Sequence, residues 1–500
     1  MHRYDLAIVG GGTAGLVAAF GAAGVGARVV LCERRAQTGG DCLWTGCVPS
    51  KSLLAAAELA QGMRTADTVG LSPTEPAIDF ARVMAHVHAA RERIEPNDSI
   101  DRLRREGVHV VQSAARFAGP GRIAVDGGEL RFRAALIATG SEPVVPALEG
   151  LDDAEPLTNE SVWDLVDQPR RLVVLGGGPV GSELGQAFAR LGTRVTIVER
   201  SRSVLAEEEP EAYDLLAERL EGEGVDLRLE TEAVRVEGDG EERRLVVRRA
   251  GAEERLPFDR ILVAAGRRAV TADLGLENAG VQTDAGGAVQ VDATLRTSAR
   301  GVFAGGDVTG ALPFTHVAGQ HGRLVVANAL FHARQRFRPD VVPWVTFTDP
   351  EVARVGLTEA QARRRFGARV SVRAHSYGEL DRAITAGRAY GFAKLVAGPR
   401  GRLVGATVAA PAGGEAIAAL VARVEAGGTL ADVSRTVHAY PTFAEGPARA
   451  ADEHLRARFF NDRVRLLTRP VLAVLRALER RTRAERDHQA SFAEFSGRSR

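Results

Sequence analysis

The chain has 500 residues, of which 45% are hydrophobic and 26% are charged, and its formal net charge at pH 7 is +1. These values are typical of a globular protein with roughly three domains. The balanced charge gives no support for nucleic-acid binding. Three cysteines are too few for a secreted disulfide framework. No apolar run is long enough to span a membrane, and the first strand begins within the opening residues, so we expect a cytoplasmic protein.

The N-terminal segment has the pattern of a dinucleotide-binding βαβ unit. An apolar strand at 6–9 leads into the loop Gly10-Gly11-Gly12-Thr13-Ala14-Gly15, a helix to Gly24 and a second strand ending at Glu33. In such a unit Gly10 allows the tight turn, Gly12 lets the backbone approach a pyrophosphate, and Gly15 lets helix and strand pack closely. The pyrophosphate lies at the positive end of the helix, and Glu33 is placed to bind a ribose hydroxyl.

The same pattern recurs about 165 residues later, where Gly176, Gly178 and Gly181 occupy the loop and Glu199 ends the second strand. Two complete units predict two bound dinucleotides, and a flavin with a nicotinamide is the economical pair. An acid at position 199 favours NADH over NADPH, although Arg200 and Arg202 provide an alternative site for a 2′-phosphate.

Further segments are expected to return to the bound nucleotides. A strand at 134–137 leads to Thr139 and Gly140, and a strand at 261–264 leads to Gly266. The turn Gly305-Gly306-Asp307 follows another strand, and Asp307 is placed to accept hydrogen bonds from ribitol hydroxyls. Ala115 and Thr315 are assigned to the same cofactor site.

A cysteine pair follows the first nucleotide unit. Residues 39–51 read Gly-Gly-Asp-Cys-Leu-Trp-Thr-Gly-Cys-Val-Pro-Ser-Lys, so Cys42 and Cys47 lie five positions apart and Lys51 is one of only two lysines in the chain. This arrangement predicts a redox-active dithiol, and the alternative is two buried structural cysteines. Residues five apart do not face each other on a regular helix, so a bridge requires a distorted first turn, which Gly46 allows. Cys32, in an apolar run, is expected in the core.

Taken in order, these motifs resemble the pyridine nucleotide–disulfide oxidoreductases with a Cys-x4-Cys active site, a family that includes dihydrolipoamide dehydrogenase, glutathione reductase and mercuric reductase. The resemblance covers about residues 4–450. It implies an α/β fold with two Rossmann-like dinucleotide-binding domains and a C-terminal α+β dimerisation domain. The implied boundaries are 1–150 with 270–338 for a split FAD domain, 151–269 for an inserted NAD(P) domain, 339–455 for the interface domain and 456–500 for a basic helical extension.

The resemblance also implies a function. Electrons would pass from NAD(P)H through FAD to a Cys42–Cys47 disulfide and on to a small disulfide, a metal ion or another acceptor. Cys47 would contact the flavin, Cys42 would meet the substrate, and Lys51 would lie near the flavin, paired with Glu183. The enzyme would be a homodimer with active sites shared between subunits. No resident metal site is expected.

Two departures from the family pattern bear on the substrate. Tyr440 occupies the position of the family's catalytic histidine, while Glu445 keeps its place and His438 lies two residues earlier. A phenol with a pKa of about 10 is a poor base at neutral pH. Mercuric reductases place tyrosine here, yet they also use a C-terminal cysteine pair, and this chain has no cysteine after Cys47. Asp41 replaces the family's threonine near the FAD pyrophosphate, where an acid would repel phosphate unless it points away.

These departures favour a mercuric reductase-like flavoprotein. The alternatives are a dihydrolipoamide dehydrogenase or glutathione-reductase type of disulfide reductase. Two alternatives belong to other classes of protein: a membrane-associated electron-transfer flavoprotein and a redox sensor.

Residues 456–500 lie beyond the resemblance and contain twelve arginines against five acidic residues. Apolar residues recur there near helical spacing, at Val464, Leu467, Val471, Val474, Leu475 and Leu478. We expect Pro470 to kink or restart this helix and the chain to fray from about Arg483. Two roles stay open: packing within the dimer, which the sequence favours, and a basic amphipathic helix resting on an anionic membrane.

Overall fold

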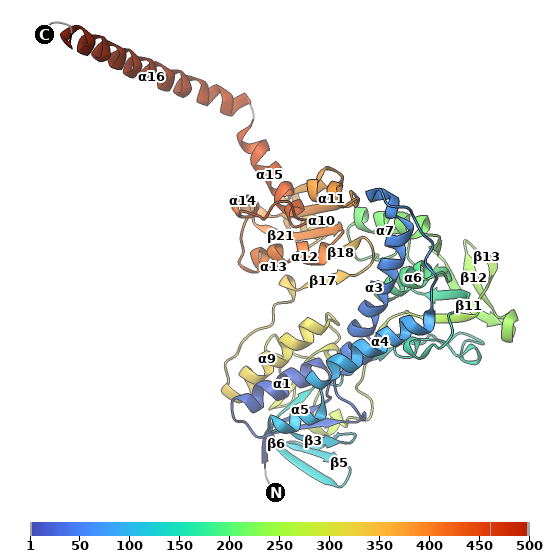
Figure 1. Ribbon diagram of the computed structural model, residues 1–500. Helices are drawn as coiled ribbons and strands as arrows, with labels where there is room; N and C mark the ends of the chain where they lie inside the picture. The colour runs from blue at the N-terminus through green and yellow to red at the C-terminus, as the bar shows by residue number, and fades with distance from the viewer. Residues whose placement is uncertain (1–2, 461, 498–500) are drawn as a thin grey trace.

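The computed structural model describes residues 3–460 and 462–497. It has three mixed parts of helices and strands, followed by a long C-terminal helix that projects away from them (Figure 1). The α/β class predicted from the sequence is confirmed. Among the described residues, no helix is both long and apolar enough to cross a membrane.

The first part is built on a seven-stranded sheet in the order β3-β2-β1-β6-β5-β4, with β16 beside β6. The strands β1, β2, β3, β6 and β16 are parallel, and β4 and β5 join them as an antiparallel pair. Their bounds are β1 Arg3–Val9, β2 Val29–Glu33, β3 His109–Gln112, β4 Arg116–Gly119, β5 Arg122–Val125, β6 Gly128–Ile137 and β16 Val302–Ala304. Residues 3–137 and 302–304 therefore share one sheet, although the second part lies between them in the sequence.

Helices cover this sheet and carry the redox segment. The pair α1 and α9 packs together beside the sheet and closes one core (Figure 1). The helices of this part are α1 Thr13–Gly24, α2 Gly40–Trp44, α3 Cys47–Arg64, α4 Phe80–Ile94, α5 Ile100–Arg105, α8 Leu276–Ala279 and α9 Thr315–Phe331.

The second part repeats the parallel arrangement on a smaller scale. Its four-stranded sheet has the order β10-β9-β8-β14, and a three-stranded antiparallel sheet β11-β12-β13 adjoins it. Short strands β7 and β15 pair where the chain passes between the first two parts. The bounds are β7 Ser141–Pro143, β8 Arg171–Leu175, α6 Pro179–Arg190, β9 Arg194–Val198, α7 Pro210–Gly222, β10 Asp226–Arg228, β11 Glu232–Glu237, β12 Arg244–Arg249, β13 Ala252–Pro257, β14 Arg260–Val263 and β15 Arg267–Ala269.

The third part is a five-stranded antiparallel sheet in the order β17-β18-β21-β20-β19 with helices packed on it. Lys394 on β20 is buried and lies 3.1 Å from Glu209 and 2.9 Å from Glu359, which ties this part to the second. The bounds are β17 Pro343–Thr346, β18 Glu351–Gly356, α10 Glu359–Phe366, β19 Ser371–Ser376, α11 Asp381–Thr385, β20 Phe392–Ala397, β21 Leu403–Ala410, α12 Gly413–Ala416, α13 Ala418–Glu425, α14 Leu430–Arg435 and α15 Glu445–Phe459.

The C-terminal extension differs from its prediction in three ways. The predicted boundary at residue 455 falls inside α15, which ends at Phe459. The next helix, α16, runs from Asp462 to Gly497 and passes through Pro470, so the proline neither ends nor restarts it. Proline removes one backbone hydrogen bond, and the turns on either side continue the helix. Fraying from about Arg483 is also wrong, because the segment beyond it is rich in helix-forming alanine, glutamate, glutamine and arginine.

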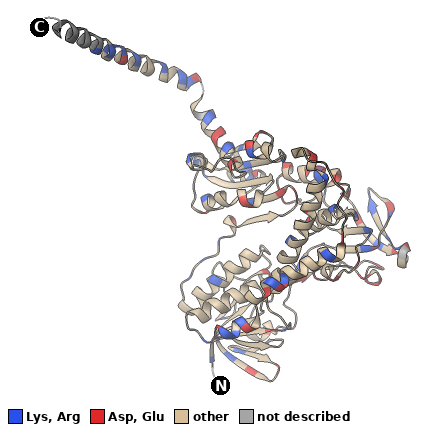
Figure 2. Cartoon of the chain, in the orientation of Figure 1, with Lys and Arg blue, Asp and Glu red and all other residues tan. Residues whose placement is uncertain are grey.

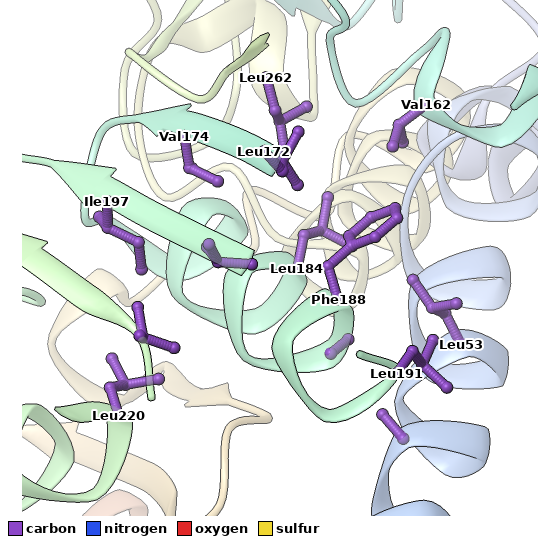
Figure 3. Close-up of a cluster of buried hydrophobic side chains, with 14 of the residues drawn as sticks. Leu53, Val162, Leu172, Val174, Leu184, Phe188, Leu191, Ile197, Leu220 and Leu262 are labelled. Carbon is purple, nitrogen blue, oxygen red and sulfur yellow. The ribbon is translucent and has the colours of Figure 1, made fainter. Parts of the chain in front are cut away.

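An apolar core joins the redox helix α3 to α6 of the second part. Leu53 of α3 and Phe188 of α6 are buried in the same cluster with Leu184 and Leu191 (Figure 3). Full burial of a leucine stabilises the fold by about 1.5–3 kcal/mol. The first turns of both helices, which carry the functional residues, are therefore held at a fixed separation.

We predict that Leu53→Ala lowers the free energy of unfolding by about 2–5 kcal/mol, because it leaves a cavity between α3 and α6. Leu59 lies on the same helix but is 69% exposed. Leu59→Ala is therefore the matched control and should change stability by less than about 0.5 kcal/mol. Urea unfolding of the FAD-bound protein, followed by circular dichroism, measures both. Equal losses for the two variants would contradict this packing.

Candidate active site

A cavity of about 1230 Å³ lies where the three parts meet. This volume suits a large nucleotide cofactor with access for a second ligand. The cavity is lined by most of the predicted cofactor and redox residues, namely Gly10, Gly12, Glu33, Cys42, Cys47, Lys51, Ala115, Thr139, Gly140, Glu183, Asp307 and Thr315.

The first glycine loop is shaped to receive a pyrophosphate. Gly10 has a φ of +107°, and a Cβ there would lie 2.3 Å from the carbonyl oxygen of Ala138. Gly12 caps α1 without any side-chain hydrogen bond, so the amides of the first turn face the cavity. Glu33 accepts hydrogen bonds from the amides of Gly11 (2.6 Å) and Arg35 (2.8 Å), which fixes the loop. These residues fit FAD, with its pyrophosphate at the N-terminus of α1.

The second glycine loop has the same internal hydrogen bonds. Glu199 accepts from the amides of Gly177 (2.7 Å) and Ser201 (2.7 Å), and Gly178 caps α6 without a side-chain partner. Gly176, Gly178, Gly181, Glu199 and Gly266 do not line the main cavity. Val180 and Leu184 of α6 do line it, and so does Arg267. A nicotinamide dinucleotide held by this loop would therefore lie next to the cavity.

Asp307 follows strand β16 at the cavity wall. Its Oδ2 accepts a hydrogen bond of 2.7 Å from the Ser141 hydroxyl. Burial raises the pKa of this carboxyl above its usual range, although the bond from Ser141 opposes the shift. The second carboxylate oxygen is not used in that bond and suits the predicted contact with ribitol hydroxyls.

The two cysteines lie on different helices. Cys42 belongs to α2, and Cys47 is the first residue of α3, with Gly46 as its N-cap. The predicted distorted first turn of a single helix is therefore wrong. Instead, α2 ends at Trp44 and a new helix, α3, begins at Cys47. A Cβ on Gly46 would lie only 3.0 Å from the carbonyl oxygen of Asp41, which explains the glycine at this break. Both cysteines are free thiols in this structure.

The pair is electrostatically polarised. A hydrogen bond from the Cys42 thiol, the Thr315 hydroxyl at 3.2 Å and the charge of Lys51 together lower the pKa of Cys47 to about 6, against burial and Asp41. The same bond to Cys47, together with burial, raises the pKa of Cys42. At neutral pH Cys47 is thus a thiolate and Cys42 a protonated thiol. This asymmetry agrees with the predicted division of roles, in which Cys47 contacts the flavin.

Lys51 and Glu183 form an ion pair of 2.8 Å across α3 and α6. The lysine ammonium also lies 4.3 Å from the centre of the Phe347 ring, and the other oxygen of Glu183 accepts a bond of 2.8 Å from the Phe347 amide. The pair thus joins all three parts of the chain at the cavity. Its catalytic role stays a prediction.

The contacts of the Asp41 carboxylate are with residues outside the glycine loop. Its Oδ2 lies 3.2 Å from Arg267, and its Oδ1 accepts hydrogen bonds from Asn159 (3.2 Å) and from the Thr45 hydroxyl. Asn159 and Arg267 lie on the two connections between the first and second parts. The residue before Cys42 is therefore tied to both connections, and Arg267 balances its charge.

Sequence reasoning missed several residues at the cavity. Arg267 follows the predicted Gly266, so its place at the cavity could have been predicted from the sequence. Nothing in the sequence marks Asn159 as a cavity residue. An aromatic stack also lines the wall: Phe314 lies between His316 and Trp344, with centroids at 5.4 and 6.0 Å. These rings come from segments 30 residues apart, so no local pattern brings them together.

The predicted acid–base residues lie elsewhere. Tyr440 and Glu445 do not line the cavity of their own chain. Tyr440 is 66% exposed and donates a hydrogen bond of 3.0 Å to Asp381. Glu445 is buried at the start of α15 and accepts bonds from the Thr442 amide (3.3 Å) and Arg449 (3.4 Å). The cavity of one chain therefore lacks the residues that the family resemblance assigned to proton transfer.

Comparison with known proteins gives the class. The model of the pyridine nucleotide-disulphide oxidoreductase family matches residues 4–322, and the model of that family's dimerisation domain matches residues 342–451. The chain belongs to this family.

Within this family, the chain is similar to several individual proteins. A mercuric reductase of Streptomyces lividans is 39% identical over 455 residues, which cover 90% of this chain and 95% of the relative. A dihydrolipoyl dehydrogenase of Thermus scotoductus is 38% identical, with 90% and 97% covered. The Cu(II) complex of the HOCl-induced flavoprotein disulfide reductase RclA from Escherichia coli superposes with a TM-score of 0.80 at 28% identity, covering 91% of this chain and 100% of that one.

The chain is therefore an FAD-dependent pyridine nucleotide–disulfide oxidoreductase of the mercuric reductase-like kind, and its reductant is NAD(P)H. Its dimerisation domain supports a homodimer. Among residues 3–460 and 462–497, no group of three or more His, Cys, Asp or Glu side chains could hold a metal ion.

We predict that Asp41→Asn lowers the pKa of Cys47 below about 6, because the Asp41 charge opposes the thiolate. Thiolate should persist to lower pH, since it is lost only as the pH falls through the pKa. The pH titration of the thiolate–flavin charge-transfer band in the two-electron-reduced enzyme measures this. Asp67→Asn, an exposed acid on the turn after α3, is the control. An unchanged or raised pKa in Asp41→Asn would contradict the electrostatic account.

Proposed function

We propose that the enzyme reduces a thiophilic divalent metal ion, held by the sulfurs of Cys42 and Cys47, with electrons from NADH. The observation that carries the proposal is the tyrosine at position 440. Its hydrogen bond to Asp381 raises the pKa of the phenol, so the group keeps its proton at neutral pH and is a poor donor as well as a poor acceptor of protons there. The mercuric reductase relative and the Cu(II)-bound neighbour support a metal acceptor.

The two candidate acceptors make different demands on protons. Cleaving a small disulfide releases a thiolate that needs a proton from a nearby acid of suitable pKa. A metal ion bound by two soft sulfur ligands needs no such step. In balance, NADH and the divalent ion give NAD⁺, the zero-valent metal and one proton, and both cysteines return unchanged.

The residues of the cavity have separable roles in this proposal. FAD, when bound, accepts the hydride of NADH and passes on two electrons. Thr315 and Lys51 stabilise the Cys47 thiolate, and Glu183 orients Lys51 between the two nucleotide loops. The Cys47 thiolate, which is exposed to the cavity, and the neighbouring Cys42 thiol form the soft-metal site.

Several finer features belong to the same proposal. Glu199 supports NADH as the reductant, since it occupies the place of a ribose-binding acid. Tyr440 and Glu445 would reach the cavity of the partner subunit, which accounts for their absence from their own. The domain limits stay a proposal, with the end of the third domain placed at Phe459, the last residue of α15. A cytoplasmic location stays a prediction.

A second candidate is reduction of a small disulfide, as in dihydrolipoamide dehydrogenase or glutathione reductase. It is favoured by one observation: Nε2 of His438 is buried without a hydrogen-bond partner among the described residues, two positions before Tyr440. A histidine so close to the family's catalytic position offers an alternative proton carrier.

Stopped-flow reoxidation of the NADH-reduced enzyme tests the proposal, with Hg(II), Cu(II), small disulfides and quinones as acceptors. We expect Hg(II) to reoxidise the enzyme fastest, by about 100-fold over disulfides. Cys42→Ser should abolish this reaction and keep FAD reduction by NADH. Faster reoxidation by a disulfide would assign the second candidate, and equal rates in Cys42→Ser would remove the dithiol from the reaction.

Tyr440→His should restore a proton carrier and raise kcat for small disulfides by about 10–100-fold. Tyr440→Phe is the control, because it removes the hydroxyl without adding a base. The pH profile of kcat with oxidised lipoamide should gain an ionisation near neutrality in the histidine variant alone. A loss of activity in Tyr440→His would show that the pocket is shaped against disulfides.

A further inference from the structure

Helix α16 presents exposed apolar side chains along its described length. It leaves the third part and extends away from the rest of the molecule (Figure 1). It lies beyond residues 342–451, which the dimerisation domain occupies. The exposed residues include Leu467 (72%), Val471 (58%), Val474 (59%) and Leu478 (53%). So many exposed large apolar groups on one helix mark a binding surface.

The side chains of α16 segregate into two faces. At about 100° per residue, the apolar ones fill a sector of about 180°. This apolar face consists of Val464, Leu466, Leu467, Val471, Val474, Leu475 and Leu478. The arginine face lies opposite, within about 60°, and consists of Arg465, Arg469, Arg476, Arg480 and Arg483; Figure 2 shows basic residues recurring along this helix. Leu472 is the exception and lies beside the arginine face.

The charge of the helix indicates its partner. Residues 462–484 of α16 contain seven arginines and two acidic residues, a net charge of +5, whereas the whole helix, 462–497, contains eight arginines and five acidic residues, a net charge of +3. We propose that α16 lies in the plane of an anionic lipid surface, with its apolar face in the acyl boundary and its arginines at the headgroups. An amphipathic helix with a basic polar face binds in this way, through apolar burial and attraction to anionic lipids together.

A second copy of α16 fits these observations less well. The apolar face is wider than the narrow seam of a two-stranded coiled coil. Between Val464 and Leu478 it spans about two heptads, fewer than a sustained coiled coil requires. Two copies would also bring two 462–484 segments, each with a net charge of +5, against each other. Packing within the dimer, which the sequence favoured, is therefore replaced by the lipid surface.

Arg463 and Arg481 fall within the apolar sector near its two ends. Long arginine side chains can extend to the headgroups while their stems stay in apolar surroundings. Because the enzyme is a homodimer, two helices would bind together and strengthen a contact that is weak singly.

Co-sedimentation of the full-length, FAD-loaded protein tests this proposal. Vesicles of phosphatidylcholine and phosphatidylglycerol in equal parts should bind the protein, and vesicles of phosphatidylcholine alone should not. Added salt should release it, because the attraction is screened. This measurement involves no electron acceptor, so its outcome does not depend on the proposed reaction.

A matched pair of variants locates the contact. Leu478→Asp places a charge in the apolar face and should weaken binding about tenfold. Leu472→Asp changes the same residue type and the same net charge beside the arginine face, and should bind within about twofold of the parent. Equal loss in both, or equal binding to the two kinds of vesicle, would overturn the proposal. A change of oligomeric mass in Leu478→Asp without vesicles, seen by light scattering, would assign the face to a second copy instead.

Discussion

The Lys51–Glu183 ion pair is the contact on which the arrangement of the site depends. Glu183 is buried with only 8% of its side chain exposed, and it accepts from Lys51 and from the Phe347 amide. Removing the lysine would leave a carboxylate with its main charge partner lost, a strongly destabilising change in buried settings. One pair thus holds the redox helix, the nicotinamide loop and the start of the dimerisation domain in register. The apolar cluster that contains Leu53 and Phe188 also holds α3 against α6.

The positive charge of Lys51 also lowers the pKa of Cys47. Its charge favours the Cys47 thiolate, and so do the hydroxyl of Thr315 and the thiol of Cys42. Asp41 acts in the opposite sense, but its ion pair with Arg267 holds part of that charge away from the sulfur. The replacement of the family's threonine by an acid is therefore tolerated because a cation faces it. The geometry also couples the residue before Cys42 to both connections between the nucleotide-binding parts.

Much of this arrangement follows from local sequence. Both βαβ units were predictable because strand, glycine loop, helix and acid are contiguous, and Glu33 and Glu199 make equivalent bonds to their loops. The break between α2 and α3 was not, because it depends on how closely Gly46 approaches the backbone of Asp41. The aromatic stack of Phe314 and Trp344 was also missed, since it forms only when the start of α9 meets strand β17. Long-range packing, and not propensity, decides such features.

Electron entry and proton delivery are built in different places. Each chain's own cavity brings together the first glycine loop, the cysteine pair and Lys51, so the contacts that lower the pKa of Cys47 all lie within one subunit. The segment with Tyr440 and Glu445 lies outside that cavity. Within one chain, neither residue is among the groups that shift the pKa of Cys47. If the segment of one subunit completes the cavity of its partner, as proposed, a change at position 440 would alter proton delivery to the acceptor and would leave these contacts of Cys47 in place.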